Sequence, residues 1–414
     1  MLLNQVIVAR PPKDILLLLT VLVLAALGLV MVTSASLQIA ETRLGSPSYF
    51  AMRHGIYLSL AIFAGVATYM LVPLALLEKL RHVALAVAAL VLVLVLIPGI
   101  GREVNGSQRW ISFAGFTVQP SEIAKMAFVV YLAGYIHQWR TELEQSWGAF
   151  LKPLGLMALL MFLLLLEPDF GAVVVMAVAA MGMLFMAGVP SKRYLLVVLV
   201  GAGLAALIAV AQPYRVARLM NFIDPWADQF GSGYQLTQSL IAFGRGHVFG
   251  VGLGNSVQKL FYLPEAHTDF VYAVTAEELG LVGNLLLIGL FSFLCFRIFR
   301  TALRLLEQGN IFSGQMVIGF GLIIASQACI NMGVNMGILP TKGLTLPFVS
   351  YGGSSLVICA VMIALILRAE QDQTLITSAK KTLKPKAKLR LRSPDIKPIK
   401  PRRPFAVRAP GGRL

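Results

Sequence analysis

Carboxylates, a histidine and a lysine gather in one polar stretch, residues 259–280, of a chain otherwise rich in apolar residues. Glu265, His267 and Asp269 lie close together there, directly before an apolar segment. A partly desolvated carboxylate has a raised proton affinity and suits general-base catalysis. Asp269 is therefore the first candidate for a catalytic residue, although an aspartate just before a helix is also commonly its N-cap.

Glu277 and Glu278 follow Asp269 in the helix expected over 270–296. At about 100° per residue, Glu277 lies about 80° around that helix from Asp269 and about 12 Å further along it. Glu278 lies on the opposite side. We therefore expect Glu277 to border the same cavity as Asp269 and Glu278 to point elsewhere.

Polar residues also precede and open another apolar segment. Arg109 stands beside Trp110, and Glu122 and Lys125 follow three residues apart. Arg109 could hold an anion while the Trp110 ring covers an apolar or sugar surface, although a membrane interface explains Trp110 equally well. Glu122 and Lys125 are within reach of each other on a helix, so they form either a self-neutralising pair or a cavity wall where Lys125 meets an anion.

Two more basic candidates are Arg245 and Lys342, each in a polar stretch containing glycine. Gly352 and Gly353 could let an anion approach the backbone, although glycines at a helix start are more often a packing device. If the helices expected to begin near 121, 270 and 348 start side by side, their N–H groups create an anion site without a metal.

The chain lacks the motifs of a metal or nucleotide site. Its three cysteines lie apart in apolar segments and its five histidines are scattered, so we expect neither a zinc site nor a disulfide framework. The glycines between 244 and 254 lack the spacing of a nucleotide fingerprint and indicate tight turns.

Membrane helices must position these residues. The 414 residues are 57% hydrophobic and only 13% charged, and apolar windows of about 20 residues recur, as spanning helices require. The sequence predicts an all-α polytopic membrane protein of about ten transmembrane helices. Their expected ranges are 15–35, 54–77, 83–100, 121–138, 153–167, 170–189, 194–212, 270–296, 313–338 and 348–368. The first apolar run is long and lacks a cleavage site, so we expect a retained anchor.

Lysine and arginine in the short loops predict the orientation. With the N-terminus in the cytoplasm, eleven basic residues lie inside and five outside. We therefore expect both termini to be cytoplasmic, and the long loop of about 213–269, with Asp269, to be extracytoplasmic between helices seven and eight. Helical apolar spacing over 234–243 predicts that this loop is partly helical.

Three regions follow: a cytoplasmic N-terminus (1–14), the membrane domain (15–370) and a basic tail (371–414). Most of the net charge of +16 lies in the tail, where residues 373–414 hold thirteen Lys or Arg and one acid, Asp395. Such a composition cannot bury a core and is typical of disorder. It favours contact with anionic membrane lipids over a protein partner, and nucleic acid is not expected.

Several motifs now resemble the SEDS family of peptidoglycan polymerases, in the family's order over about residues 15–370. They are Gln-Pro-Ser-Glu-Ile-Ala-Lys at 119–125, Gly-Tyr-Gln-Leu-Thr-Gln-Ser-Leu-Ile-Ala-Phe-Gly-Arg-Gly at 233–246, Pro-Glu-Ala-His-Thr-Asp-Phe at 264–270, Pro-Thr-Lys-Gly-Leu-Thr-Leu-Pro at 340–347 and Ser-Tyr-Gly-Gly-Ser-Ser at 350–355. Segments 32–36, 254–259 and 341–345 resemble the division branch of the family. Glu167-Pro-Asp169 departs from its common Gln-Pro-Asp, which leaves the role of Glu167 open.

The resemblance implies an enzyme that polymerises lipid II, an undecaprenyl diphosphate disaccharide pentapeptide, on the outer side of the cytoplasmic (inner) membrane at the division septum. Asp269 matches the family's essential loop aspartate and would act as general base in an inverting transfer. Trp110, Glu122 and Lys125 match cavity residues. We expect Arg109 and Lys125, then Arg245 or Lys342, to stabilise the departing diphosphate. A divalent cation, Mg or Mn, is a weaker implication.

The same resemblance implies protein partners: the class B penicillin-binding protein FtsI and the regulators FtsQ, FtsL and FtsB. The main alternative is a lipid II flippase, a transporter that would need polar groups along its full depth. Charge concentrated on the outer side favours the enzyme. A third reading is a scaffold whose basic tail recruits partners.

Overall fold

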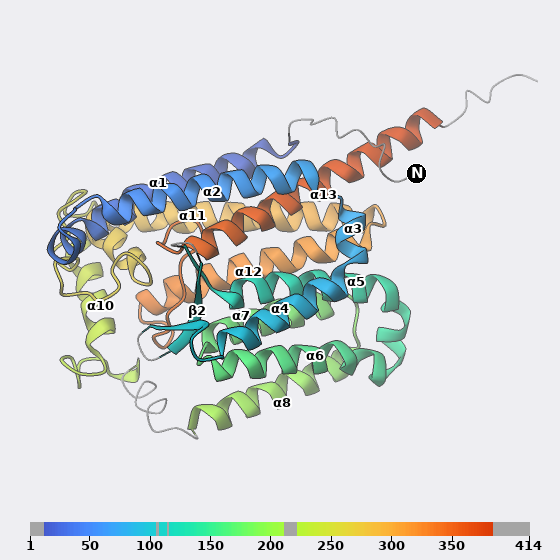
Figure 1. Ribbon diagram of the computed structural model, residues 1–414, viewed down its shortest axis with the longest axis horizontal. Coiled ribbons are helices and arrows are strands. Elements are labelled where there is room, and N and C mark those ends of the chain that lie inside the picture. Colours follow the sequence, from blue (N-terminus) through green and yellow to red (C-terminus); the bar gives the residue numbers. More distant parts are fainter. Residues whose placement is uncertain (1–11, 105–106, 114–115, 211–221, 384–414) are drawn as a thin grey trace, which may run out of the picture. The chain divides into compact units, whose positions relative to one another are not determined.

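The computed structural model describes residues 12–104, 107–113, 116–210 and 222–383, and its helices are seen in Figure 1. The chain divides into two compact units, Met1–Gln373 and Thr374–Leu414. Parts of the expected N-terminus, long loop and tail, at 1–11, 211–221 and 384–414, lie outside the described residues.

Ten helices of at least 15 residues occur among the described residues. They are α1 (Ile15–Leu44), α2 (Tyr49–Leu71), α4 (Arg81–Val95), α5 (Pro120–Gln145), α6 (Trp147–Leu166), α7 (Phe170–Met186), α8 (Ser191–Val210), α11 (Val271–Glu307), α12 (Ile311–Asn335) and α13 (Gly353–Leu383). The short α3 (Leu74–Lys79) precedes α4, and α10 (Tyr234–Gly246) lies in the long loop. Within that described part, α1, α2, α6, α11, α12 and α13 are long and apolar enough to cross a membrane. The predicted all-α polytopic membrane fold is confirmed.

A small antiparallel sheet, which the sequence reading missed, connects α4 to α5. Its strands β1 (Gly101–Val104), β2 (Ser107–Phe113) and β3 (Phe116–Val118) pair in chain order. Ile111 of β2 pairs with Gly101 on one side and Val118 on the other. The expected helix over 83–100 ends earlier, at Val95, because the chain turns into this sheet.

α11 is interrupted at Gly280, whose φ of 67° and ψ of −162° are not helical. A Cβ there would overlap the backbone nitrogen of Gly250, so the site requires glycine. The loop after α10 fills the interruption: Val251 N donates to Glu277 O, and Leu281 N donates to His247 O, at 3.0 Å each. The loop thereby satisfies backbone groups that the broken helix leaves unpaired.

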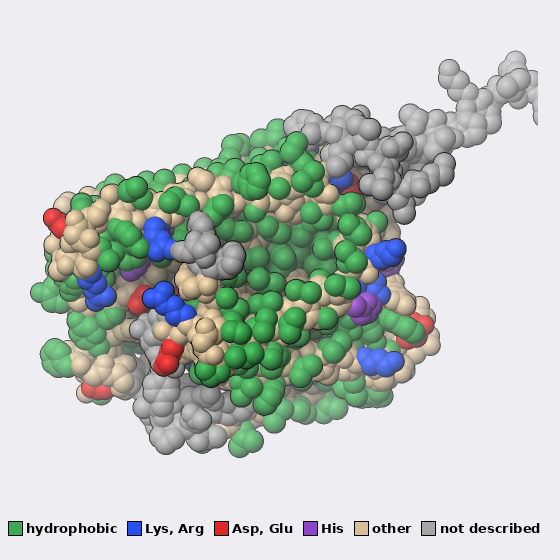
Figure 2. Space-filling model, viewed as in Figure 1, with side chains coloured by type: hydrophobic (Ala, Val, Ile, Leu, Met, Phe, Trp, Pro, Cys, Tyr) green, Lys and Arg blue, Asp and Glu red, His purple; other side chains and the backbone are tan. Residues whose placement is uncertain are grey.

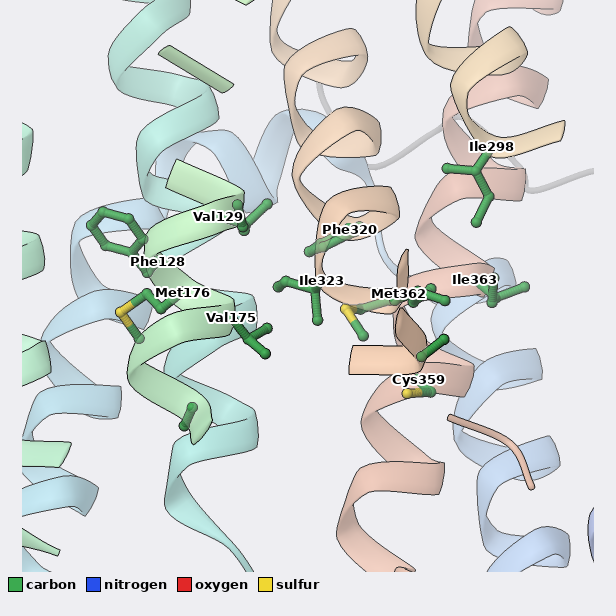
Figure 3. Close-up of a cluster of buried hydrophobic side chains, with 14 of the residues drawn as sticks. Phe128, Val129, Val175, Met176, Ile298, Phe320, Ile323, Cys359, Met362 and Ile363 are labelled. Atoms are coloured by element: carbon green, nitrogen blue, oxygen red, sulfur yellow. The ribbon is translucent and has the colours of Figure 1, made fainter. Parts of the chain in front are cut away.

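α12 is the central helix of the Met1–Gln373 unit. Its span is 78% buried, more than any other candidate span among the described residues. Figure 3 shows Phe320 and Ile323 of α12 among hydrophobic side chains that include Val129 and Val175 of α5 and α7. A Cβ at Gly319 would overlap Val129, so this small residue allows α12 and α5 to approach closely.

The surface is divided along the bundle. Figure 2 shows hydrophobic side chains over the middle of the visible face, with Lys, Arg, Asp, Glu and His toward its two ends. Many large apolar side chains are exposed, among them Phe63, Phe162 and Leu199. Such an apolar belt suits contact with lipid rather than water. The charged side chains lie toward the two ends, where they avoid the cost of placing charge inside a bilayer.

Packing of α10 on α11 supplies a stability prediction. A Cβ at Gly246 would overlap the carbonyl oxygen of Ala276, whereas one at Gly244 would meet nothing within 4 Å. We expect Gly246→Ala to lower the free energy of unfolding by about 1–3 kcal/mol through overpacking. Gly244→Ala, the matched control, should be neutral or stabilising by about 0.5–1 kcal/mol. Thermal unfolding in detergent tests this, and equal Tm values for both variants would contradict it.

Candidate active site

Asp269 lies at the junction between the long loop and α11. The N-cap of α11 is Phe270, which makes no side-chain cap hydrogen bond, and the side chain that binds an N–H group of the first turn is Asn335 of α12. The alternative that Asp269 is merely an N-cap is therefore wrong. The main-chain oxygen of Asp269 accepts hydrogen bonds from the Asn331 and Asn335 amides of α12, at 2.8 and 3.0 Å.

A segment before α13 forms one wall beside Asp269. A Cβ at Gly343 would lie 2.8 Å from Asp269 Oδ2, so the backbone here approaches the carboxylate directly. The neighbouring Lys342 ammonium lies 4.6 Å from the ring centroid of Phe170, the first residue of α7. Leu344 packs over Gly171, where a Cβ would lie 2.9 Å away. Asp269, Lys342 and the start of α7 therefore meet.

The turn between α6 and α7 is built around Asp169. Asp169 Oδ1 accepts a hydrogen bond from Ala172 N at 3.1 Å and so caps α7, while Oδ2 accepts one from Gln119 Nε2 at 3.0 Å. Glu167 in the same turn is 1% exposed, and neither carboxyl oxygen has a hydrogen-bond partner among the described residues. The turn therefore contains one acid, Asp169, with two hydrogen-bond partners, and one, Glu167, whose carboxyl oxygens have no partner among the described residues.

Arg109 fixes the sheet to this turn. Its Nε donates to Glu167 O at 2.9 Å and its Nη2 to Pro168 O at 2.7 Å. Trp110 follows in the same strand, but the pairing of β2 with β1 skips Arg109, so side chains do not alternate regularly at this point. The hypothesis that Arg109 and Trp110 together cover one ligand stays a prediction.

The expected convergence of helix starts is found. Gln119 N, just before α5, donates to Ser354 Oγ of α13 at 3.2 Å. Tyr351 N, just before α13, donates to His267 O, just before α11, at 3.0 Å. The Asp169–Gln119 bond adds the start of α7, which the sequence reading did not include. Gly353 has a packing role, because a Cβ there would overlap the Tyr57 ring.

Glu122 and Lys125 are a buried ion pair on α5, 2.9 Å apart and 4% and 1% exposed. Gln327 of α12 donates to Glu122 Oε1 at 3.4 Å. Gln327 precedes Asn331 by one helical turn, so the Glu122–Lys125 pair lies about 6 Å deeper along α12 than the hydrogen bond from Asn331 to Asp269 O. The structural pair is confirmed, and contact between Lys125 and a substrate anion stays a prediction.

Glu277 is not at the cavity with Asp269, which corrects our expectation. It is fully buried, and its carboxylate accepts hydrogen bonds from Ser256 Oγ and from the backbone of residues 257 and 258. Arg245, 42% exposed, lies 3.5 Å from the same carboxylate. Glu277 thus holds the long loop, because donors of the loop satisfy its buried carboxylate. Arg245 contributes to the same contact.

Glu278 points away from Asp269, as expected, and forms a second contact with the loop. Its carboxylate pairs with Lys259 at 2.7 Å and accepts a hydrogen bond from Ser34 of α1. The Lys259 ammonium also donates to Ser34 Oγ at 2.9 Å. This buried cluster joins α1, the long loop and α11.

Charge and burial tune two carboxyl groups at this end of the bundle. The pKa of Asp269 is raised to about 7, chiefly by burial and also by the charges of Glu265 and Asp169, while Arg109 opposes the shift. Burial, with Asp169, raises the pKa of Glu167 to about 8, again opposed by Arg109. Asp269 is thus partly ionised near neutral pH, whereas Glu167 remains mostly protonated.

The described residues contain no group of three or more His, Cys, Asp or Glu side chains that could hold a metal ion. Asp169 already uses both oxygens on protein donors.

Sequence reasoning missed several residues that build the site. Asp169 stood in a noted motif but was not assigned a role, and Asn331 and Asn335 were not singled out. Their four-residue spacing on one helix face, inside an apolar segment, was the available signal. The two asparagines bind the main-chain oxygens of Asp269 and Leu344, which only the folded chain brings together.

The fold and the site define a polytopic membrane protein with a carboxyl group of raised pKa, Asp269, and convergent helix starts at one end of its bundle. The model of the FtsW/RodA/SpoVE family, described as "Cell cycle protein", matches residues 14–375. The chain belongs to this family, the SEDS family named above.

Relatives and solved structures agree with that membership. The chain is 67% identical over 353 residues to the "Probable peptidoglycan glycosyltransferase FtsW" of Alcanivorax borkumensis, covering 85% of this chain and 92% of the relative. It is 52% identical over 351 residues to a protein of the same name from Pseudomonas fluorescens, covering 85% and 86%. A structure described as "Structural coordination of polymerization and crosslinking by a peptidoglycan synthase complex" matches with a TM-score of 0.71 and 29% identity, covering 86% of this chain and 97% of that chain. The rod shape determining protein RodA of Thermus thermophilus matches with a TM-score of 0.62 and 28% identity, covering 86% and 96%.

Glu167 gives a pH prediction for stability. In the folded protein its pKa is raised from 4.5 to about 8, so between these values the folded state binds more protons than the unfolded state. The free energy of unfolding therefore falls as pH rises through this window. Glu167→Gln removes that contribution, whose slope is at most about 1.4 kcal/mol per pH unit. Thermal unfolding from pH 5 to 8 should show a flatter dependence in the variant, and parallel curves would refute the assignment.

Proposed function

We propose that this protein is a peptidoglycan glycosyltransferase that polymerises lipid II into glycan strands for septal wall synthesis. Asp269 carries the proposal, because a partly buried carboxyl group with a pKa near 7 lies where the starts of several helices meet. The family membership and the names of the relatives support the same activity.

In the proposed reaction Asp269 acts as general base. Its carboxylate takes the proton from the 4-hydroxyl of the acceptor sugar as that oxygen attacks the anomeric carbon of the donor chain. The new C–O bond forms as the bond to the lipid diphosphate breaks, with inversion at carbon, and the electron pair leaves on the diphosphate. A base with a pKa near the working pH is ionised enough to act and basic enough to accept the proton.

Cations and helix starts would stabilise the departing diphosphate, because negative charge develops there. Lys342 lies in the segment against Asp269, and Arg109 is close enough to lower the pKa of Asp269. Lys125 is deeper and paired with Glu122. The geometry therefore favours Lys342 and Arg109 for direct contact with phosphate, ahead of Lys125. Arg245 is held by Glu277 in the loop and is the weakest of the four.

The flippase alternative is not favoured. The titratable groups around Asp269 gather at one end of the bundle, and the Glu122–Lys125 ion pair lies about 6 Å deeper along α12. The relatives' names specify a glycosyltransferase. A divalent cation bound with the substrate diphosphate stays an expectation of the family resemblance.

Partners and location follow from the same proposal. The synthase complex described above joins polymerisation to crosslinking, which supports a penicillin-binding protein as partner. We propose FtsI in this role and FtsQ, FtsL and FtsB as regulators, at the division septum of the inner membrane. Both termini would be cytoplasmic, with the basic tail near anionic lipid.

The central test is polymerisation of labelled lipid II by the purified protein with its transpeptidase partner. We expect Asp269→Ala and Asp269→Asn to lose at least about 100-fold in rate, the low end of general-base contributions. Wild-type kcat/KM should rise with pH through about 7 as Asp269 loses its proton. Asp228→Asn, a matched change at an exposed loop aspartate, should retain activity. Normal polymer from both Asp269 variants would exclude the base, and flipping in liposomes without polymer would favour the transporter.

The close approach of Gly343 yields a second test. An alanine Cβ would lie 2.8 Å from Asp269 Oδ2 and must displace the carboxylate. We expect Gly343→Ala to lower kcat on the order of 100-fold, since small displacements of a catalytic group have effects of this size. Tm should change little, because residue 343 is exposed. Gly244→Ala, whose Cβ meets open space, is the control; full activity of Gly343→Ala would show that the carboxylate position is not critical.

A further inference from the structure

Two asparagines of α12 hold the backbone of Asp269. Asn331 and Asn335 are one turn apart, both are buried, and both donate to the Asp269 main-chain oxygen. Both lie in the last turns of α12, and their burial requires the hydrogen bonds of the amides with water to be replaced.

The remaining contacts of the two asparagines differ. Asn335 Oδ1 accepts a hydrogen bond from Ala273 N in the first turn of α11 at 3.1 Å, and its main-chain oxygen accepts one from Ser239 of α10 at 2.7 Å. Asn335 therefore joins helices. Asn331 Nδ2 instead donates to Leu344 O at 2.6 Å, so one amide group bridges Asp269 and the 342–344 segment.

The identity of the amide atoms follows from these partners. Both are carbonyl oxygens, which accept only, so the NH₂ group of Asn331 must face them. Its Oδ1 is then left buried without a partner among the described residues. An unsatisfied buried acceptor is unfavourable, so the local arrangement favours the two donated bonds over complete satisfaction of the side chain.

We propose that Asn331 is a positioning residue that fixes the catalytic base Asp269 against the 342–344 segment and so sets its spacing from Lys342. The inference rests on the proposed function and assigns the geometry of its site to a residue that touches neither substrate nor the Asp269 carboxylate. Because the same amide holds both carbonyls, loss of its donors removes this link between the base and the cation-bearing segment, while Asn335 still holds Asp269 O.

The test compares Asn331→Leu, which removes both donors at similar volume, with wild type in lipid II polymerisation. We expect kcat to fall on the order of 100-fold while KM changes less than about 3-fold, because positioning acts on the reacting geometry. Asn284→Leu is the matched control: Asn284 is a buried asparagine of α11 that also has an unpartnered Oδ1 within the described residues. Its kcat should match wild type.

A double-mutant cycle with Gly343→Ala separates positioning from general destabilisation. If Asn331 holds the Gly343 backbone against Asp269, the loss from Gly343→Ala should be much smaller in the Asn331→Leu background than in wild type. Losses that multiply independently overturn the proposal. If Asn331→Leu does not fold, Asn331→Ser, which is smaller and cannot bridge both carbonyls, replaces it with the same expectations.

The same measurements separate the proposed function from the proposed role of Asn331. Polymer from wild type and none from Asp269→Asn supports the proposed function alone. With that result in hand, wild-type kcat for folded Asn331→Leu overturns only the role of Asn331. No polymer from wild type with its partner overturns the proposed function itself.

Discussion

Pairing of every backbone N–H and C=O away from water is the constraint on which this structure depends. Helices satisfy it throughout most of the bundle, but α11 breaks at Gly280. The loop at 247–252 supplies the missing partners, through Val251 and Gly252 N–H groups and the His247 and Val248 carbonyls. The long loop is therefore built into the helix that Asp269 precedes.

Side chains reinforce this backbone junction. Adjacent residues Glu277 and Glu278 point to different neighbours, yet both engage the stretch 256–259. Neither carboxylate is left unpaired in the interior, where an isolated charge would be strongly unfavourable. Ser34 extends the cluster to α1. These contacts fix where the loop leaves α11 and thus the path by which it returns to Asp269.

The end of the bundle that carries Asp269 combines this fixed loop with three other helix starts, those of α5, α7 and α13. Asp169 caps α7 and binds Gln119 before α5, while Arg109 joins the sheet to the same turn. Their charges act on the pKa of Asp269 in opposite directions, and burial decides the net upward shift. Two effects therefore act against each other at this site: burial and neighbouring acids raise the pKa of Asp269, and the Arg109 guanidinium limits the shift.

The sequence by itself determined the helical membrane fold, the helical part of the long loop and Asp269 as the leading candidate, because apolar period and isolated polarity are local signals. It also indicated the Glu122–Lys125 pair, whose three-residue spacing fixes their contact. Only the tertiary structure showed that Glu277 and Arg245 hold the loop, that Arg109 binds the α6–α7 turn, and that Asn331 bridges Asp269 to Leu344. These contacts join residues far apart in the chain through backbone atoms, which every residue carries alike and no sequence pattern marks.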